Sequence, residues 1–244
     1  MICKNKVAIV TGAAGKGMGR SIALTLAREG AKVVINYRSS RQAAEIIVNH
    51  IAKTGRNAIA IQADVFEADA CKKLVDVTRK EFGQVDICII GPGGGWHPAP
   101  LDKLDPAAAL KDVQQELAPI YNLMPLLLPE MYKRQWGRLI GIALLPPYTS
   151  PAYSYNIGKA ARAHALLLAR DEVWKNGVTI NIIGPDPVSN IETLEEAIEQ
   201  CNHGQAWQKR TTTSPQDIAE SVAFLCSDAG RFISGCVVSY LFNE

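Results

Sequence analysis

Residues 7–19 read Val-Ala-Ile-Val-Thr-Gly-Ala-Ala-Gly-Lys-Gly-Met-Gly, a short apolar run that leads into a glycine-rich turn. The run from Lys6 to Val10 predicts a buried strand, and the residues from Ser21 to Glu29 have helical spacing. Glycines let the backbone pass close to a pyrophosphate, and the N-terminus of a helix offers free N–H groups to an anion. A strand, a glycine turn and a helix in this order indicate a dinucleotide site rather than an ordinary tight turn.

The rest of the chain alternates in the same way between apolar strands and amphipathic helices. Strands that are apolar throughout, each joined to the next by a helix, predict a parallel sheet covered on both faces. We expect a single α/β domain over residues 1–244, with a seven-stranded, mainly parallel, doubly wound sheet. Three prolines in the expected helix 106–133 predict kinks there. The further strands are expected at 32–35, 58–61, 86–90, 138–143, 178–183 and 236–241, and the further helices at 41–53, 68–82, 153–174 and 215–226.

The composition excludes several classes of protein. The chain has 244 residues with 26 basic and 24 acidic side chains, and this net charge of +2 does not favour nucleic acid or an anionic membrane as a partner. Hydrophobic residues make up 48% and charged residues 20%, which is typical of a globular protein with a sizeable core. Six scattered cysteines without a Cys-x-x-Cys pair, and a first apolar run of only four residues, predict a cytoplasmic protein with reduced thiols. The histidines show no metal-ligand spacing, so we expect no metal.

The residues after the second strand bear on the choice of cofactor. An acidic side chain here would accept hydrogen bonds from the adenosine ribose and favour NAD, but the sequence reads Asn36-Tyr37-Arg38-Ser39-Ser40-Arg41. The cations Arg38 and Arg41, with Lys16 from the glycine turn, suit a 2′-phosphate. The sequence therefore predicts NADP(H).

Several short motifs, in the correct order along the whole chain, resemble the short-chain dehydrogenase/reductase family and its ketoacyl-reductase-like group. The resemblance rests on residues 11–19, Asp64-Val65, Gly137-Arg138, residues 155–159, residues 181–185 and residues 214–219. It implies a Rossmann fold, a homotetramer or dimer, a small carbonyl or alcohol substrate, and a segment at about 187–213 that covers it. The cofactor-binding residues that it implies, together with the catalytic pair, are Gly12, Ala14, Gly15, Lys16, Gly17, Met18, Arg38, Ser39, Asp64, Val65, Gly91, Gly93, Tyr155, Lys159, Pro185 and Val188.

In that family the tyrosine of Tyr-x-x-x-Lys is the general acid/base for hydride transfer at a carbonyl. Here Tyr155 and Lys159 are one helical turn apart and so lie on the same face. The charge of Lys159 is expected to favour the tyrosinate, and its ammonium can also hold the nicotinamide ribose. The resemblance assigns catalysis to this pair.

The sequence departs from the family pattern around the substrate. The usual serine after the fifth strand is absent from Gly141-Ile142-Ala143-Leu144-Leu145, and the usual catalytic asparagine falls at Glu116. Loss of one oxyanion donor typically costs on the order of 100- to 1000-fold in rate. A replacement donor is sought among Tyr148, Ser150, Tyr153 and Ser154. Glu116 is interpreted either as a proton relay or as a surface glutamate beside a kinked helix.

Two functions remain open on this evidence. The first is an NADPH-dependent oxidoreductase that acts on a ketone or secondary alcohol, and the second is a catalytically impaired NADP(H)-binding subunit or cofactor sensor. Trp96 and His97 follow the glycine run 91–95 and could reach a substrate, with His97 an alternative general acid. Apolar residues on more than one face of the helices 106–133 and 153–174 favour burial against a second subunit.

Overall fold

The computed structural model describes residues 1–95, 97–144, 152–185, 188–204 and 212–240. Its centre is a seven-stranded sheet in the order β3-β2-β1-β4-β5-β6-β7, and all six neighbouring pairs are parallel. The strand order reverses between β1 and β4, so this is the predicted doubly wound α/β fold. The strands are β1 (Val7–Val10), β2 (Lys32–Tyr37), β3 (Ala58–Gln62), β4 (Ile87–Ile90), β5 (Gly137–Ile142), β6 (Val178–Pro185) and β7 (Val237–Tyr240).

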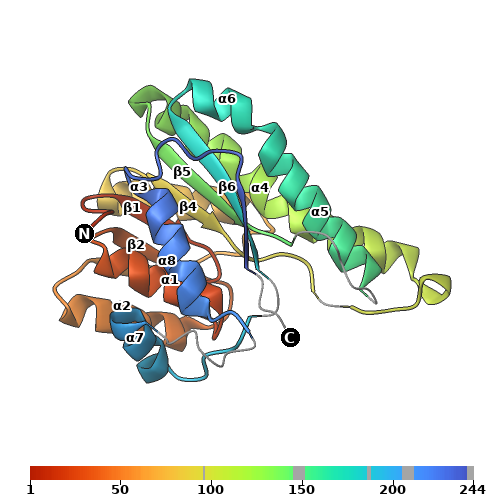
Figure 1. Cartoon of the computed structure of the whole chain (residues 1–244), viewed down its shortest axis with the longest axis horizontal. Coiled ribbons are helices and arrows are strands. Elements are labelled where there is room, and N and C mark those ends of the chain that lie inside the picture. Colours follow the sequence, from red (N-terminus) through yellow and green to blue (C-terminus); the bar gives the residue numbers. More distant parts are fainter. Residues whose placement is uncertain (96, 145–151, 186–187, 205–211, 241–244) are drawn as a thin grey trace.

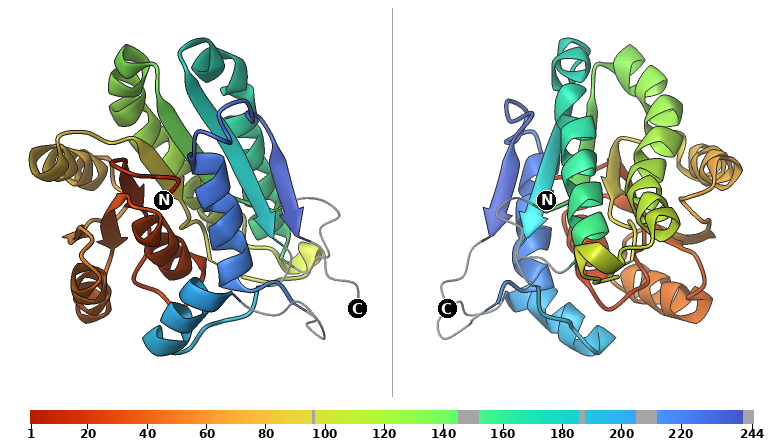
Figure 2. Two further views of the ribbon diagram at one scale, coloured as in Figure 1. Left: turned by 60° about the vertical axis from the view of Figure 1, so that its left-hand side comes forward. Right: turned by 90° about the vertical axis from the view of Figure 1, so that its right-hand side faces the viewer.

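Helices cover both faces of the sheet and enclose two hydrophobic cores (Figures 1 and 2). One core lies under α1, α2, α7 and α8, and the other lies under α3, α4, α5 and α6. The inner strands β1, β4, β5 and β6 are buried on both faces, which explains why their sequences are largely apolar rather than alternating. The helices are α1 (Met18–Arg28), α2 (Arg41–Lys53), α3 (Ala68–Phe82), α4 (Pro106–Arg134), α5 (Tyr153–Leu168), α6 (Arg170–Lys175), α7 (Leu194–His203) and α8 (Pro215–Cys226), with a short 3-10 helix at Leu101–Lys103.

One helix differs from the sequence-based expectation. The expected helix 153–174 is divided at Ala169, whose N–H donates to the carbonyl three residues back, at Leu166. The expected helix 106–133 is confirmed as α4, one helix of 29 residues that contains Pro119, Pro125 and Pro129. Burial of its apolar side against the sheet and α5 outweighs the hydrogen bonds that the prolines remove.

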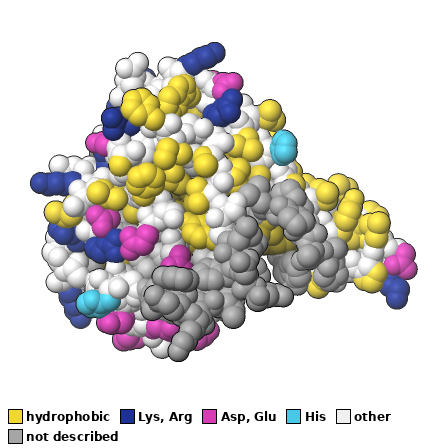
Figure 3. Space-filling view, viewed as in Figure 1, with side chains coloured by type: hydrophobic (Ala, Val, Ile, Leu, Met, Phe, Trp, Pro, Cys, Tyr) yellow, Lys and Arg dark blue, Asp and Glu magenta, His cyan; other side chains and the backbone are white. Residues whose placement is uncertain are grey.

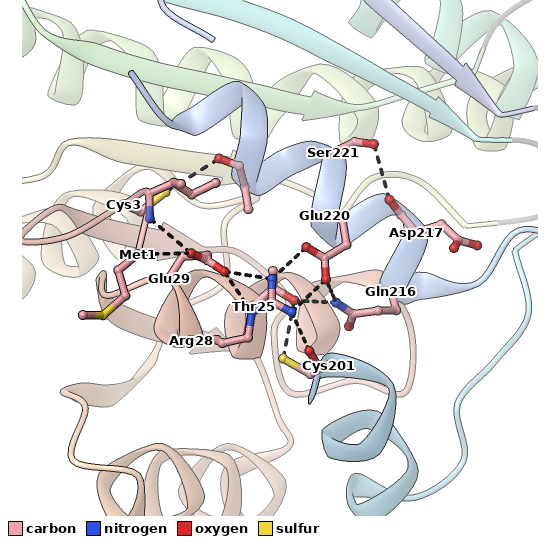
Figure 4. A network of polar contacts seen from close by, with 12 residues as sticks. Met1, Cys3, Thr25, Arg28, Glu29, Cys201, Gln216, Asp217, Glu220 and Ser221 are labelled. Atoms are coloured by element: carbon pink, nitrogen blue, oxygen red, sulfur yellow. Dashed lines mark hydrogen bonds and ion pairs between the residues drawn. The ribbon is translucent and has the colours of Figure 1, made fainter. Parts of the chain in front are cut away.

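Part of the expected covering segment 187–213 belongs to the core. Ile191, Ala197 and Cys201 are at most 4% exposed, and residues 194–203 form α7, which packs on α1. Polar contacts fasten this region, as Figure 4 shows. The Arg28 guanidinium of α1 pairs with Glu220 of α8 at 2.7 Å and also donates to the carbonyl of Cys201 in α7. Residues 194–203 of this segment are therefore a helix that is packed into the domain against α1, the helix that follows the glycine turn.

Candidate active site

The glycine turn between β1 and α1 is shaped by two glycines and one asparagine. Gly12 has a φ of +64°, which a side chain would strain. A Cβ at Gly19 would lie 2.7 Å from the carbonyl oxygen of Gly12, so the helix can start here only with glycine. The buried Asn36 at the end of β2 accepts from the Gly12 N–H at 3.2 Å and donates to the Ala63 carbonyl at 3.0 Å. This amide joins the turn to β2 and β3.

A cavity of about 530 Å³ opens at the carboxyl ends of these strands. Open parallel sheets bind their ligands at this place, where the strand order reverses. The cavity brings together most of the residues that the sequence predicted for the cofactor. Its wall includes Gly12, Ala14, Gly15, Arg38, Ser39, Asp64, Val65 and Gly93, together with Asn36, Pro92, His97 and Gln115.

The cationic end of this site extends further than the sequence predicted. A second hollow of about 590 Å³ shares Arg38 and Asp64 with the first and adds Arg41 and Lys73. Lys73 comes from α3 and was not among the predicted residues. The predicted contact of Lys16 with this region is not seen, because its ammonium pairs with Glu192 on the segment before α7.

The remaining predicted cofactor residues do not line the 530 Å³ cavity. Gly17, Met18 and Gly91 line a smaller hollow of about 190 Å³, together with Ile142 at the end of β5. Pro185 ends β6, and Val188 forms a bridge with Thr213. Trp96, Tyr148 and Ser150 lie outside the described residues.

Tyr155 and Lys159 both lie on α5, as predicted. The Lys159 ammonium is 5.2 Å from the centre of the Tyr155 ring, and Lys159 is only 7% exposed. Its charge, however, is directed at Glu116 of α4, with 3.2 Å between Nζ and Oε1. The interpretation of Glu116 as a surface residue is wrong, because its side chain is completely buried.

The second partner of Glu116 is Arg162, which the sequence analysis missed. Its Nε is 3.0 Å from Oε2 of Glu116, and the guanidinium is also fully buried. Arg162 donates to the carbonyls of Gly91 at 2.9 Å and Ile142 at 3.0 Å, and to that of Pro92. It therefore ties α5 to the ends of β4 and β5 and to α4. The spacing of Tyr155, Lys159 and Arg162, which places them on one helical face, could have revealed it.

Two glycines make room for the Glu116 side chain. A Cβ at Gly93 would overlap its carboxylate, and a Cβ at Gly158 would lie 2.7 Å from its Cγ. The buried acid thus accounts for the glycine at 93, which the sequence analysis predicted for the cofactor. Both carboxylate oxygens lack a hydrogen bond in the described structure, so the two cations balance the charge by ion pairing.

This arrangement alters the acid–base properties of the pair. Burial and the nearby Arg162 lower the pKa of Lys159 to about 8, although Glu116 acts in the opposite direction. Burial, reinforced by Glu116, raises the pKa of Tyr155 above its ordinary value. The expectation that Lys159 would favour the tyrosinate is therefore not met in this state. A protonated Tyr155 is suited to donate a proton to a carbonyl oxygen.

The structure narrows the search for a replacement of the missing serine. Ala143 is buried after β5 and carries no hydroxyl. Ser154 is buried too, and its hydroxyl donates to the Asp112 carboxylate at 2.8 Å. Of the four candidates, only Tyr153 and Ser154 lie within the described residues, and Tyr153 is 45% exposed.

Two further findings concern the ranges that the structure describes. Within them, no helix is both long and apolar enough to cross a lipid bilayer. Over the same ranges, no three side chains of the metal-binding types gather closely enough to hold a metal ion.

Comparisons with known proteins agree with this geometry. Residues 12–240 match the family model described as enoyl-(acyl carrier protein) reductase. The chain is 30% identical to the 3-oxoacyl-(acyl-carrier-protein) reductase FabG of Staphylococcus aureus, over 94% of each chain. It is 33% identical to versicolorin reductase of Emericella nidulans, over 96% of this chain and 93% of that protein. A 7α-hydroxysteroid dehydrogenase, solved with NADH and 7-oxo glycochenodeoxycholic acid, superimposes with a TM-score of 0.84 and 28% identity, covering 98% of this chain and 93% of that one.

The sheet, the glycine turn and the large cavity define an oxidoreductase that uses a nicotinamide cofactor. The chain belongs to the short-chain dehydrogenase/reductase family.

Replacement of Glu116 by glutamine should destabilise the protein in a pH-dependent way. The change leaves Lys159 and Arg162 as buried, unbalanced cations, and breaking a buried pair costs about 3 kcal/mol. Loss of the Glu116 carboxylate charge lowers the pKa of Lys159 further, so Lys159 becomes neutral at a lower pH in the folded variant than in the folded wild type. The deficit in unfolding free energy should be largest at pH 6 and smaller at pH 9. Denaturant titration at both pH values measures it.

Glu192→Gln is the matched control, because Glu192 forms an exposed ion pair with Lys16. Such a pair contributes about 0–1 kcal/mol, so this variant should stay close to the wild type. An equal deficit for Glu116→Gln at pH 6 and pH 9 would show that Lys159 is not coupled to Glu116.

Proposed function

We propose that this protein is an NADP(H)-dependent oxidoreductase that interconverts a ketone and a secondary alcohol. The observation that carries the proposal is the placement of Lys159 5.2 Å from the Tyr155 ring on α5, in a chain whose glycine turn and Arg38 line a cavity at the carboxyl ends of the strands. A reduced nicotinamide cofactor supplies the hydride. The chain supplies the proton, from the hydroxyl of Tyr155 to the substrate oxygen.

The residues around Tyr155 support the direction of reduction. A raised pKa keeps this hydroxyl protonated at neutral pH, ready to donate. The Lys159 ammonium is paired with the Glu116 carboxylate. When the ammonium moves away from this carboxylate, it can bind the cofactor ribose instead. We also propose that the segment 187–213 covers the substrate and that the protein acts in the cytoplasm.

A second candidate function is an impaired cofactor-binding subunit or sensor. It is favoured by residues 141–145, which offer no hydroxyl after β5 where the family usually has a serine, and by Glu116 in place of the usual asparagine. The retained Tyr155 favours the enzyme, because binding alone does not require its hydroxyl. NADPH binding without turnover of any member of a carbonyl panel would support this second function.

The protein should bind NADPH more tightly than NADH. Arg38 lines the cavity and is exposed, so its guanidinium can pair with a 2′-phosphate. Arg38→Ala should weaken NADPH binding about 10-fold, the scale of one charge-assisted hydrogen bond, and leave NADH binding nearly unchanged. Fluorescence titration measures both, with Arg56→Ala as a control, because Arg56 follows the C-terminal end of α2 and lines a different hollow. Equal affinities of the wild type for the two cofactors would exclude the proposed preference.

Tyr155→Phe should lower turnover at least about 100-fold, the scale of general acid catalysis, while NADPH affinity stays within a few-fold. The change keeps the ring and removes the hydroxyl. Tyr121→Phe, at a tyrosine of α4 that is 63% exposed and does not line the cavity, is the matched control. Lys159→Ala should harm both turnover and NADPH binding. Undiminished turnover in Tyr155→Phe would assign the proton transfer to another group.

The protein should assemble into a homodimer or homotetramer. Exposed apolar side chains occur on the paired helices α4 and α5, whose ends project beyond the sheet, and include Leu110 at 71% and Ile157 at 46% exposure. Figure 3 shows hydrophobic side chains on this projection and across the middle of the same face. Burial against a second copy would remove this apolar area from water. A monomer mass by light scattering at micromolar concentration would contradict the proposal.

A further inference from the structure

His97 belongs to a chain of three polar side chains from three separate elements. Its Nδ1 is 3.0 Å from Oδ1 of Asp112 on α4, and Oδ2 of Asp112 accepts from the Ser154 hydroxyl of α5 at 2.8 Å. Asp112 and Ser154 are 4% and 3% exposed, whereas the His97 side chain is 67% exposed. A buried carboxylate, bonded at both oxygens, thus holds a histidine that faces solvent.

The carboxylate determines how the imidazole can act. An ionised carboxylate only accepts hydrogen bonds, so Nδ1 of His97 must be the donor. When both ring nitrogens of a histidine carry a proton, both are donors, so a ring that donates from Nδ1 to Asp112 keeps its Nε2–H for an anionic ligand. The carboxylate therefore orients the ring, as carboxylates orient metal-binding histidines through the N–H of the other ring nitrogen.

The place of the ring distinguishes a cofactor contact from a substrate acid. His97 lines the large cavity together with Gly12, Gly15 and Arg38, whereas Tyr155 and Lys159 are not among the described residues that line it. Arg38 is the only lysine or arginine among these lining residues, and Asp64 is the only acid. An anionic ligand in this cavity would therefore meet Arg38 and His97 as its two candidate side-chain cations.

We propose that His97, held by Asp112 and Ser154, binds the anionic phosphates of the nicotinamide cofactor. This inference rests on the proposed function, which places a cofactor in the cavity. Ser154 directly precedes Tyr155, so the same hydrogen bonds join the cofactor-binding loop to the first turn of α5. Asp112 and Ser154 are positioning residues, which act through His97.

A double-mutant cycle tests the proposal, with NADPH as the probe. His97→Gln should raise the Kd for NADPH about 3- to 10-fold, the range for one partly exposed charge contact. Asp112→Asn keeps the shape of the side chain and should raise the Kd by a similar factor. Since Asp112 acts through His97, the double variant should be no worse than the weaker-binding single variant. Fluorescence titration gives the four constants, and circular dichroism checks that Asp112→Asn is folded.

His164→Gln is the control, because His164 is an exposed histidine of α5 that does not line the cavity. The Kd of this variant for NADPH should equal that of the wild type. Unchanged NADPH binding in His97→Gln would overturn the inference while leaving the proposed cofactor intact. Unchanged binding with a loss of turnover would do the same and make His97 a substrate acid. Failure of the wild type itself to bind NADPH would instead overturn the proposed function and this inference with it.

Discussion

The arrangement of the site depends on the buried guanidinium of Arg162. One side chain from α5 satisfies the carbonyls that end β4 and β5 and reaches the backbone and carboxylate of Glu116 on α4. Buried carbonyls need a donor, and the Arg162 guanidinium supplies one to each of them. Because Arg162 does this while paired with Glu116, the position of α5 and the charge around Lys159 are determined by the same contact.

The fold could be predicted from the sequence because its evidence is local. The apolar strands, the glycine turn and the helix ends each involve neighbouring residues, and all of them indicate the parallel sheet that the structure has. The differences arise where packing overrides local preference. The expected helix 153–174 is divided at Ala169, and the segment 187–213, which was expected to cover the substrate, also contributes Ile191 and Cys201 to the core.

The candidate site could be predicted only in part, because charge pairing joins residues far apart in sequence. Tyr155, Lys159, Arg38 and the glycine turn follow from motifs. The surroundings of Lys159 do not, since Glu116 is 43 residues away in the chain, on another helix, and its burial depends on how α4 and α5 pack. The same holds for Asp112 and Ser154, which are separated by 42 residues. A lysine expected to act on the neighbouring tyrosine is instead paired with an acid.

The glycines at 93 and 158 couple three positions of this site. Each leaves space that the Glu116 side chain occupies, so a larger residue at either position would force that side chain to move from its contacts with the two cations. The three positions therefore form an epistatic unit, in which the effect of any single substitution depends on the ancestral background that receives it.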